Sequence, residues 1–389
     1  MDSSFFFLFL SLETNKKVKV KTRILSVFML FLPLCGSAQK ISMGSCTTRD
    51  GGEYKGEMVA GKPHGKGNTV FKNGDTYEGE YAKGKRQGYG VYTFSDGEKY
   101  EGQWFQDQQH GQGTFYFMNN NKYVGLWFRD YQQGHGIMYY YNGDKYEGNW
   151  YQDHRNGKGK YTSAGGEYYD GEWKFDEKWG RGTFDWNDGT TYNGMWAHNL
   201  RNGKGTNKYA DGDVYTGDWK DDIQHGKGIY KFQNGDVYEG DYVQGERTGE
   251  GIFRYANGDK YTGHFSEGDK SGQGTLVWKN GDVYTGQWKN DKQNGRGKLT
   301  KKNGDVFDGN FNNGKVHGEV IIHFKDGMKF KGTFRDGKRN GPAIEEDKDG
   351  TRFEGTYVDD RREGKFVIKD KNGRLKESGV YERGRKIIE

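Results

Sequence analysis

Four histidines recur at one position of a periodic sequence, and imidazole groups at a regular spacing could bind metal ions. They are His64, His110, His225 and His317, which are separated by multiples of 23 residues. Imidazole nitrogen is a common zinc ligand, but a zinc site needs three or four ligands close together. Each of these histidines immediately precedes a glycine. We expect them to be loop residues, with a repeated metal array as the alternative.

The tripeptide Asn-Gly-Asp is the second pattern that could bind a metal, because carboxylate and amide oxygens are calcium ligands. It occurs, among other places, at residues 73–75, 142–144, 234–236, 257–259 and 280–282. A calcium loop supplies about six to eight oxygens, more than this tripeptide offers. Asn-Gly between two strand-like runs predicts a tight turn, because both residues tolerate positive φ. We expect turns here, and calcium is the alternative.

Catalytic chemistry has no recognisable pattern in this chain. A Ser-His-Asp or Cys-His site is defined by its geometry, and scattered residues do not establish one. No glycine-rich, phosphate-cradling loop follows a strand-like run. We therefore predict that the protein is not an enzyme and that it holds no cofactor and no metal.

These residues all belong to a 23-residue unit that recurs fourteen times without insertion or deletion. Each unit begins with an aromatic residue, called here the lead aromatic, and glycines follow it by two and by eleven residues. The lead aromatics stand at positions 54, 77, 100, 123, 146, 169, 192, 215, 238, 261, 284, 307, 330 and 353. A fixed period in this range predicts stacked repeats, each needing its neighbours to bury its apolar side.

One repeat predicts two antiparallel strands. Tyr100, Gly102 and Trp104 alternate with polar residues, and Gly113 to Phe117 is a second alternating run. Side chains alternate between the two faces of a strand, so one face should be aromatic and the other polar. We expect a loop of several residues ending near Gly111, and a shorter turn between repeats. The predicted fold is all-β: an elongated single-layer antiparallel meander of about fourteen stacked hairpins, twisted or curved into a ribbon.

The glycines two residues after each lead aromatic need a structural reason, because glycine weakens a strand unless another group approaches closely. We expect rings from adjacent strands to cover them. The structural glycines of the first eight repeats are Gly56, Gly79, Gly102, Gly125, Gly148, Gly171, Gly194 and Gly217.

The aromatic face is the predicted partner-binding surface. A single-layer sheet has nothing to cover its rings unless it dimerises, and exposed apolar strips mark partner sites. The alternative is that the rings pack only against one another within the sheet. The candidate partner-binding residues are Tyr100, Trp104, Tyr123, Trp127, Tyr146, Trp150, Tyr169, Trp173, Tyr192, Trp196, Tyr215 and Trp219.

Composition and charge narrow the class of partner. The chain is 31% hydrophobic and 16% aromatic, with 65 glycines and only 3 prolines, which fits short strands joined by glycine turns. The formal charge is +5, of which residues 1–38 carry +3, leaving +2 for the remainder. A non-specific nucleic-acid binder needs a stronger basic excess, so we expect no nucleic-acid partner.

The N-terminus has the order of parts found in an export signal. Lys16 to Arg23 is cationic, Ile24 to Leu34 is largely apolar, and Gly36 to Ala38 supplies small residues before a cut at Gln39. The apolar run is too short to span a bilayer comfortably. An uncleaved anchor is the alternative, and the residues before Lys16 are consistent with an over-extended start. We expect an exported protein of the periplasm or cell envelope, or a secreted one, with membrane association possible.

Four segments are predicted along the chain. Residues 1–38 are the signal peptide, 39–50 a flexible leader, 51–374 the repeat array, and 375–389 a degenerate repeat with a C-terminal cap. Cleavage after Ala38 leaves one cysteine, so no disulfide can form within the mature chain.

The run Tyr77-Glu-Gly-Glu-Tyr-Ala-Lys-Gly-Lys-Arg-Gln-Gly88-Tyr-Gly90 resembles the MORN repeat (membrane occupation and recognition nexus), and Tyr238 to Gly251 is close to it. The resemblance covers about five-sixths of the chain. It implies an elongated single-layer sheet of stacked hairpins and a scaffold or interaction role. Some members dimerise, some bind proteins along a groove, and some associate with phospholipid. MORN repeats also precede certain kinase and methyltransferase domains, but we expect no such domain here.

The C-terminal repeats depart from the pattern. The lead tyrosine becomes Phe307, Phe330 and Phe353, and the glycine thirteen residues after the lead becomes Val320, Ala343 or Phe366. Terminal repeats are commonly atypical because one face has no neighbour. We expect a gradual cap, with a distinct docking end as the alternative.

Together these features predict an exported, non-catalytic scaffold that binds a protein partner or itself, as a homodimer, through an aromatic-lined groove. Two alternatives stay open. One is association with membrane phospholipid. The other is binding of cell-surface glycan by exposed tyrosine and tryptophan rings.

Overall fold

The computed structural model describes residues 40–387. The predicted signal peptide and its proposed cleavage site before Gln39 lie outside the described residues. The chain divides into residues 1–40 and residues 41–389, and the second unit is the one described below. Its regular elements are 31 β-strands, which confirms the predicted all-β class. Within the described residues, no helix is long and apolar enough to cross a membrane.

The strands of the first half are β1 Ser42–Thr47, β2 Glu53–Val59, β3 Lys62–Val70, β4 Thr76–Ala82, β5 Lys85–Thr93, β6 Lys99–Phe105, β7 Gln108–Tyr116, β8 Lys122–Phe128, β9 Tyr131–Tyr139, β10 Lys145–Tyr151, β11 His154–Thr162, β12 Tyr168–Lys174, β13 Glu177–Asp185, β14 Thr191–Ala197 and β15 Leu200–Lys208. Those of the second half are β16 Val214–Lys220, β17 Ile223–Lys231, β18 Val237–Val243, β19 Glu246–Arg254, β20 Lys260–Ser266, β21 Asp269–Val277, β22 Val283–Lys289, β23 Lys292–Thr300, β24 Val306–Asn312, β25 Lys315–His323, β26 Lys329–Arg335, β27 Lys338–Glu346, β28 Arg352–Val358, β29 Arg361–Lys369, β30 Leu375–Glu382 and β31 Arg385–Ile387.

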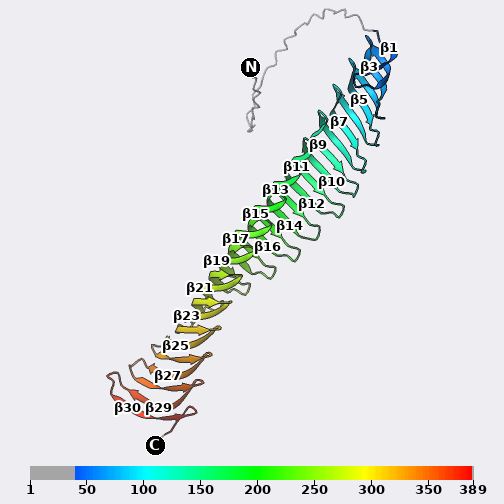
Figure 1. The fold of residues 1–389 in the computed structure, drawn as a ribbon. Coiled ribbons are helices and arrows are strands. Elements are labelled where there is room, and N and C mark those ends of the chain that lie inside the picture. Colours follow the sequence, from blue (N-terminus) through cyan, green and yellow to red (C-terminus); the bar gives the residue numbers. More distant parts are fainter. Residues whose placement is uncertain (1–39, 388–389) are drawn as a thin grey trace, which may run out of the picture. The chain divides into compact units, whose positions relative to one another are not determined.

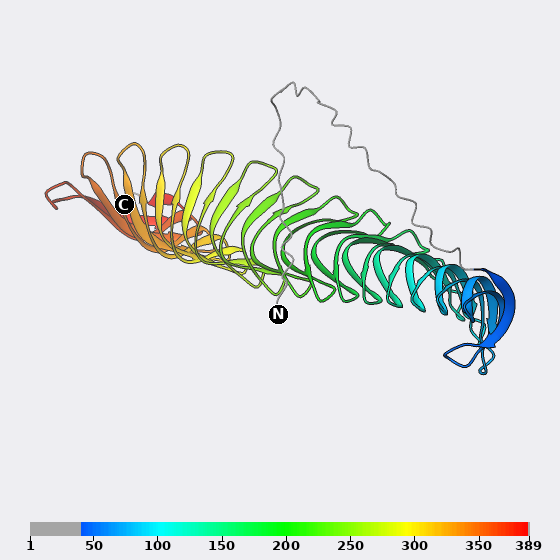
Figure 2. The same cartoon turned by 90° about the horizontal axis from the view of Figure 1, so that it is seen from above.

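Each strand pairs antiparallel with the strand before it and the strand after it, so β1 to β31 form one continuous meander. The strands follow one another along a single open layer (Figure 1). Seen from above, each hairpin is bent into an arc (Figure 2). The predicted single-layer meander of stacked hairpins is therefore confirmed.

The connection inside each repeat is shorter than predicted. β6 ends at Phe105 and β7 begins at Gln108, so only two residues form the turn. Gln106 and Asp107 have φ of 51° and 74°, as the two central residues of a type I′ turn require. The prediction of a longer loop near Gly111 was wrong, because Gly111 lies within β7 with φ of 60° and the pairing of β6 with β7 shifts register after Gly102. Gly111 is the positive-φ glycine of a β-bulge.

The connection between repeats is the longer one, with residues 71–75 joining β3 to β4. Gly74 has φ of 91° and donates its N–H to the Phe71 carbonyl at 3.0 Å. Asn73 has no positive φ, contrary to expectation; its side-chain oxygen accepts the Asp75 N–H at 3.2 Å. The Asn-Gly turn is present, but only its glycine uses the left-handed region.

Aspartates at both kinds of turn tie neighbouring repeats together. In the two-residue turn, Asp222 accepts the Arg201 N–H of the preceding repeat at 2.8 Å. At the opposite edge, Asp75 accepts the Ser95 N–H of the following repeat at 2.9 Å. Such bonds satisfy backbone donors that the ladder leaves unpaired. They explain why aspartate recurs at both turns.

The sheet extends beyond both predicted boundaries of the array. The segment 39–50, predicted as a flexible leader, contains β1, which pairs with β2 along its whole length. Cys46 lies in β1 and packs, partly buried, against the aromatic core. At the other end, β30 and β31 continue the meander through the predicted degenerate repeat. The repeat pattern weakens at both ends, although strand pairing persists.

A tyrosine ring lies over the glycines of each regular repeat. A Cβ on Gly148 would lie 2.6 Å from the Tyr146 hydroxyl oxygen, and one on Gly159 would lie 2.5 Å from Cζ of the same ring. Gly148 and Gly159 face each other in β10 and β11. One lead tyrosine thus covers a glycine pair within its own hairpin. We expected the covering rings to come from adjacent strands.

Replacing Gly148 by Val should destabilise the sheet around β10 and β11, because the new side chain collides with Tyr146. Overpacking of this kind costs about 1–3 kcal/mol. Hydrogen exchange of the β10 and β11 amides should report it, since a long repeat array need not unfold in one step. Asn149→Val is the matched control, because Asn149 faces away from the ring and is exposed. Equal exchange rates in the two variants would contradict the packing described.

Candidate functional site

The twelve aromatic residues predicted to contact a partner are buried. The six tyrosines among them are 0–1% exposed and the six tryptophans 4–6% exposed. They belong to one continuous hydrophobic cluster that runs from Tyr54 to Phe311. In this chain the rings pack against one another within the sheet, as the alternative interpretation expects.

The rings form a zipper of edge-to-face contacts along the sheet. Tyr123 packs at 90° against Trp127 of its own repeat and at 85° against Trp150 of the next, with ring centroids 5.3 Å apart in both cases. The Tyr123 hydroxyl donates to the Leu126 carbonyl at 3.0 Å, and the Trp150 indole N–H donates to the Gly136 carbonyl at 3.3 Å. Each ring therefore buries its apolar surface and satisfies its polar atom.

Cations nine residues after the lead aromatic cover the zipper. The Arg155 guanidinium lies 4.2 Å from the Trp173 ring centroid, and Arg201 lies 4.2 Å from that of Trp219. A cation over an aromatic face gains electrostatic energy while its aliphatic stem covers apolar surface. The sequence analysis missed this role. The recurrence of Arg or Lys at this position could have indicated it, at Arg86, Arg155, Lys178, Arg201, Arg247, Lys270, Arg339 and Arg362.

The zipper stops where the repeats change. Its last rings are Tyr284 and Phe311, and a second cluster runs from Val320 to Phe366. Val320 stands where the eleven preceding repeats have a glycine, and a Cβ on the facing Gly309 would lie 2.7 Å from its side chain. No room remains there for a ring to cover a glycine pair. The departure of the C-terminal repeats from the sequence pattern therefore changes how the core packs.

An open groove lies on the face opposite the zipper and crosses eight strands, β13 to β20. We call it the glycine groove; its volume is about 900 Å³. The residues that line it are Arg181, Asn193, Gly194, Met195, Lys204, Gly205, Thr206, Thr216, Gly217, Lys227, Gly228, Ile229, Glu239, Gly240, Glu250, Gly251, Ile252 and Thr262. None of the twelve predicted rings is among them.

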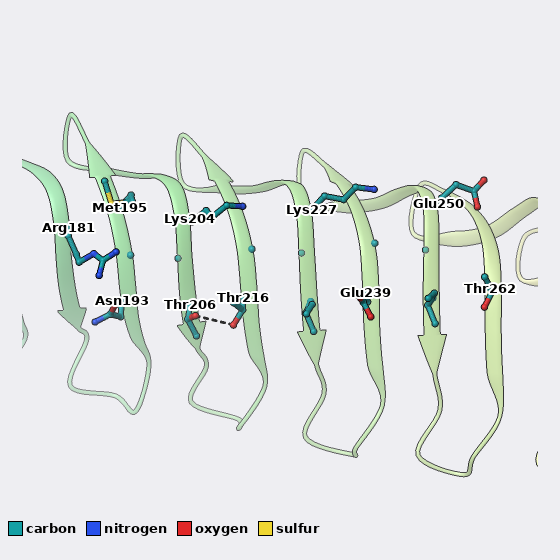
Figure 3. Close-up of a pocket in the computed structure, with 18 residues that line it drawn as sticks. Arg181, Asn193, Met195, Lys204, Thr206, Thr216, Lys227, Glu239, Glu250 and Thr262 are labelled. Atoms are coloured by element: carbon teal, nitrogen blue, oxygen red, sulfur yellow. Dashed lines mark hydrogen bonds between the residues drawn. The ribbon is translucent and has the colours of Figure 1, made fainter.

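Strand alternation explains the composition of the groove. Residues one and three positions after a lead tyrosine point away from the zipper, and glycine lies between them. Figure 3 shows Met195, Lys204 and Lys227 on one side of the strand centres and Thr206 and Thr216 on the other. The Thr206 and Thr216 hydroxyl oxygens lie 3.0 Å apart. The groove therefore has a backbone floor between two rows of side chains.

Exposed rings occur elsewhere than predicted. Tyr89, Phe105, Phe128 and Tyr131 are between 47% and 56% exposed and belong to neighbouring strands β5 to β9. His110 lies between Phe105 and Phe128, with centroid distances of 5.5 and 5.2 Å. Most repeats carry small or charged residues at the positions of Phe105 and Phe128, so the scaffold does not require these rings.

Two of the four histidines considered for metal binding, His64 and His317, accept a backbone N–H, whereas His110 Nδ1 is buried without a hydrogen-bond partner among the described residues. His317 Nδ1 accepts the Asp336 N–H at 3.4 Å, and the aspartates of the Asn-Gly-Asp turns accept backbone hydrogen bonds, as Asp259 does from Lys279 at 2.8 Å. Within residues 40–387, no group of three or more His, Cys, Asp or Glu side chains is placed to hold a metal ion.

Thirteen units of this chain match a family model described as the MORN repeat. The matched residues are 54–76, 77–99, 100–122, 123–145, 146–168, 169–191, 192–214, 215–237, 238–260, 261–283, 284–306, 330–352 and 353–365. The unit between 306 and 330, where the zipper stops, is not matched. No curated protein sequence matches the chain.

Solved structures with similar strand arrangements include the SAS-4 TCP domain of Drosophila melanogaster in complex with a proline-rich motif of Ana2, at 15% identity and a TM-score of 0.28, covering 46% of this chain and 90% of that one. The TCP10 domain of Danio rerio CPAP has 18% identity and a TM-score of 0.29, covering 50% of this chain and 96% of that one. TM-scores this low support no comparison of function.

Alkaline pH should unfold the zipper. Burial raises the pKa of Tyr192 to about 12 from 10.0, and that of Tyr284 likewise to about 12. A raised pKa means that the neutral phenol is favoured in the folded chain. This contribution to stability is complete below pH 10 and is lost as the pH rises through 12. Tyrosinate absorbance should therefore rise together with loss of the β-sheet circular dichroism signal. Ionisation of all 28 tyrosines with an unchanged sheet signal would contradict this.

Proposed function

Because this chain belongs to the MORN-repeat family, we propose that it is a non-catalytic interaction protein that binds a segment of a partner protein in the glycine groove. The observation that carries the proposal is the separation of the two faces of one sheet. The aromatic rings are buried in the zipper on one face, and the groove on the other face is open.

The groove has the composition of a recognition site. Ile229 and Ile252 offer apolar surface, while Arg181 and Glu250 offer charges that can orient a ligand. Sites for extended ligands combine apolar contact area with a few placed polar groups.

The groove is held in shape from behind. The floor glycines Gly194 and Gly205 pair with each other, and the Tyr192 ring lies against both on the zipper face. A floor fixed by buried rings needs little reordering when a ligand binds, and a preorganised site loses less entropy on binding. In this proposal the twelve predicted rings support the binding surface and do not contact the partner.

Two further parts of the proposal rest on the sequence. Export to the periplasm, the cell envelope or the exterior rests on the pattern of residues 16–38, all of which lie outside the described residues. Self-association as a homodimer is the case in which the bound segment comes from a second copy.

Glycan binding is the second candidate function, and the exposed rings Tyr89, Phe105 and Phe128 favour it. Aromatic rings with an open face can stack on sugars, and polar side chains such as Gln103 lie beside them. Membrane phospholipid remains the third candidate. Its test is vesicle binding that weakens as salt screens the charges.

Blocking the groove should abolish partner capture. In Thr216→Trp, an indole replaces an exposed side chain of the groove and should weaken binding by about tenfold or more, or about 1.4 kcal/mol. Val243→Trp is the control, because Val243 is 50% exposed on β18 but lies outside the groove. The measurement is a crosslinked affinity pull-down with each variant in the native host.

One stoichiometric protein, or the chain itself, should be captured by the wild type and the control but not by Thr216→Trp. If Thr216→Trp still captures the partner, the binding site lies outside the groove. If the wild type captures only glycan and Phe105→Ala captures none, the result favours glycan binding, the second candidate function.

A further inference from the structure

The charges along the glycine groove are segregated. Arg181 and Lys204 line its β13–β15 end, whereas Glu239 and Glu250 line its β18–β19 end. Lys227 lies between them on β17. One end of the groove is therefore basic and the other acidic.

Ion pairs within the sheet neutralise the lining charges of the groove except Arg181 and Glu250; at the acidic end, Glu239 Oε2 lies 3.1 Å from Arg254 Nη1. Lys204 Nζ lies 2.7 Å from Asp218 Oδ1, and Lys227 Nζ lies 2.6 Å from Asp241 Oδ1. The Arg181 guanidinium makes no ion pair with any residue of the described chain. The Glu250 side chain is 76% exposed, and its one ion-pair contact there is His264 Nδ1 at 3.7 Å. Arg181 and Glu250 are thus the charges free to meet a ligand.

These two charges act independently of each other. Arg181 on β13 and Glu250 on β19 are six strand spacings apart, or about 29 Å. That separation is several times the Debye length of about 8 Å at physiological ionic strength. A ligand that satisfies both must therefore carry opposite charges at its two ends.

The spacing of the two charges sets the length of a ligand that reaches both. The length of the groove across β13 to β20 is seven strand spacings, or about 34 Å. A helix rises only about 1.5 Å per residue and would need about nineteen residues to join Arg181 to Glu250. An extended chain, rising about 3.3 Å per residue, spans the distance between Arg181 and Glu250 with about nine residues.

We propose that the occupant of the glycine groove is an extended peptide segment of about nine residues, with an acidic side chain at the end that lies over Arg181 and a basic side chain at the end that lies over Glu250. The inference rests on the proposed function and adds the chemistry of the partner. Ile229 and the Thr206–Thr216 hydroxyl pair between the ends, and Ile252 on the same strand as Glu250, fit small or apolar side chains. The two charges fix the direction in which the segment lies.

The probes are two labelled synthetic peptides of identical composition. One carries two glutamates at one end and two lysines at the other, separated by serine and valine; in the second the charges alternate. Fluorescence anisotropy with the full chain measures affinity. Exposed ion pairs each change affinity by about twofold to fivefold, so the block-charged peptide should bind at least several-fold tighter, and the difference should vanish at high salt.

Protein variants test the assignment of the two ends. Arg181→Glu and Glu250→Lys should each weaken binding of the block-charged peptide by about twofold to fivefold. The double variant reverses both charges, so it should restore affinity with the peptide turned round. A photocrosslinker at the acidic end should attach near β13 in the wild type and near β19 in the double variant. Thr216→Trp should abolish binding of this peptide.

Equal affinity for the two peptides, or unchanged crosslinks in the double variant, would overturn the inference. So would binding that survives Thr216→Trp. Failure of both peptides to bind, while Thr216→Trp still prevents partner capture, would overturn the charge assignment and leave the proposed function standing. If Thr216→Trp leaves partner capture intact, the proposed function itself fails.

Discussion

The packing of one tyrosine ring over a pair of glycines is the contact on which the rest of this sheet depends. Tyr146 can lie flat against β10 and β11 because Gly148 and Gly159 have no side chains. Its ring edge then meets Trp150 and Trp173, each at about 5 Å. An open single layer has no second layer to bury apolar area, so repetition of this contact takes the place of a central core.

That packing gives the two faces of the sheet different tasks. Because side chains alternate along a strand, committing Tyr192 and Trp196 to one face leaves Asn193 and Met195 on the other. Stability and recognition therefore draw on different residues. The side chains that face the groove can differ from repeat to repeat, as Arg181 and Glu250 do, without disturbing the rings on the opposite face.

The ends of the array follow from the same constraint. Where Val320 replaces a glycine, the ring can no longer lie flat, and the core continues as a separate cluster built on Phe330 and Phe353. Strand pairing continues past the zipper, because the backbone groups keep the same ladder and the C-terminal strands pack a cluster of their own. β1 and β30 therefore remain part of the sheet although their sequences depart from the repeat.

The 23-residue period, the alternation around Tyr100 and the glycines by themselves determined the all-β class, the antiparallel meander and the aromatic face, because local periodicity reports which side of a strand is buried. They could not distinguish a buried ring from a binding ring, since burial of Tyr123 depends on Trp150 of the next repeat. The two-residue turn at Gln106 and Asp107 was also missed, because aspartate adopts positive φ readily but glutamine does not mark a turn. Only the tertiary structure decided that the rings are buried in the core and that the groove lies on the opposite face. The reason is that the groove is formed by side chains from eight strands, whose relative positions depend on the whole sheet.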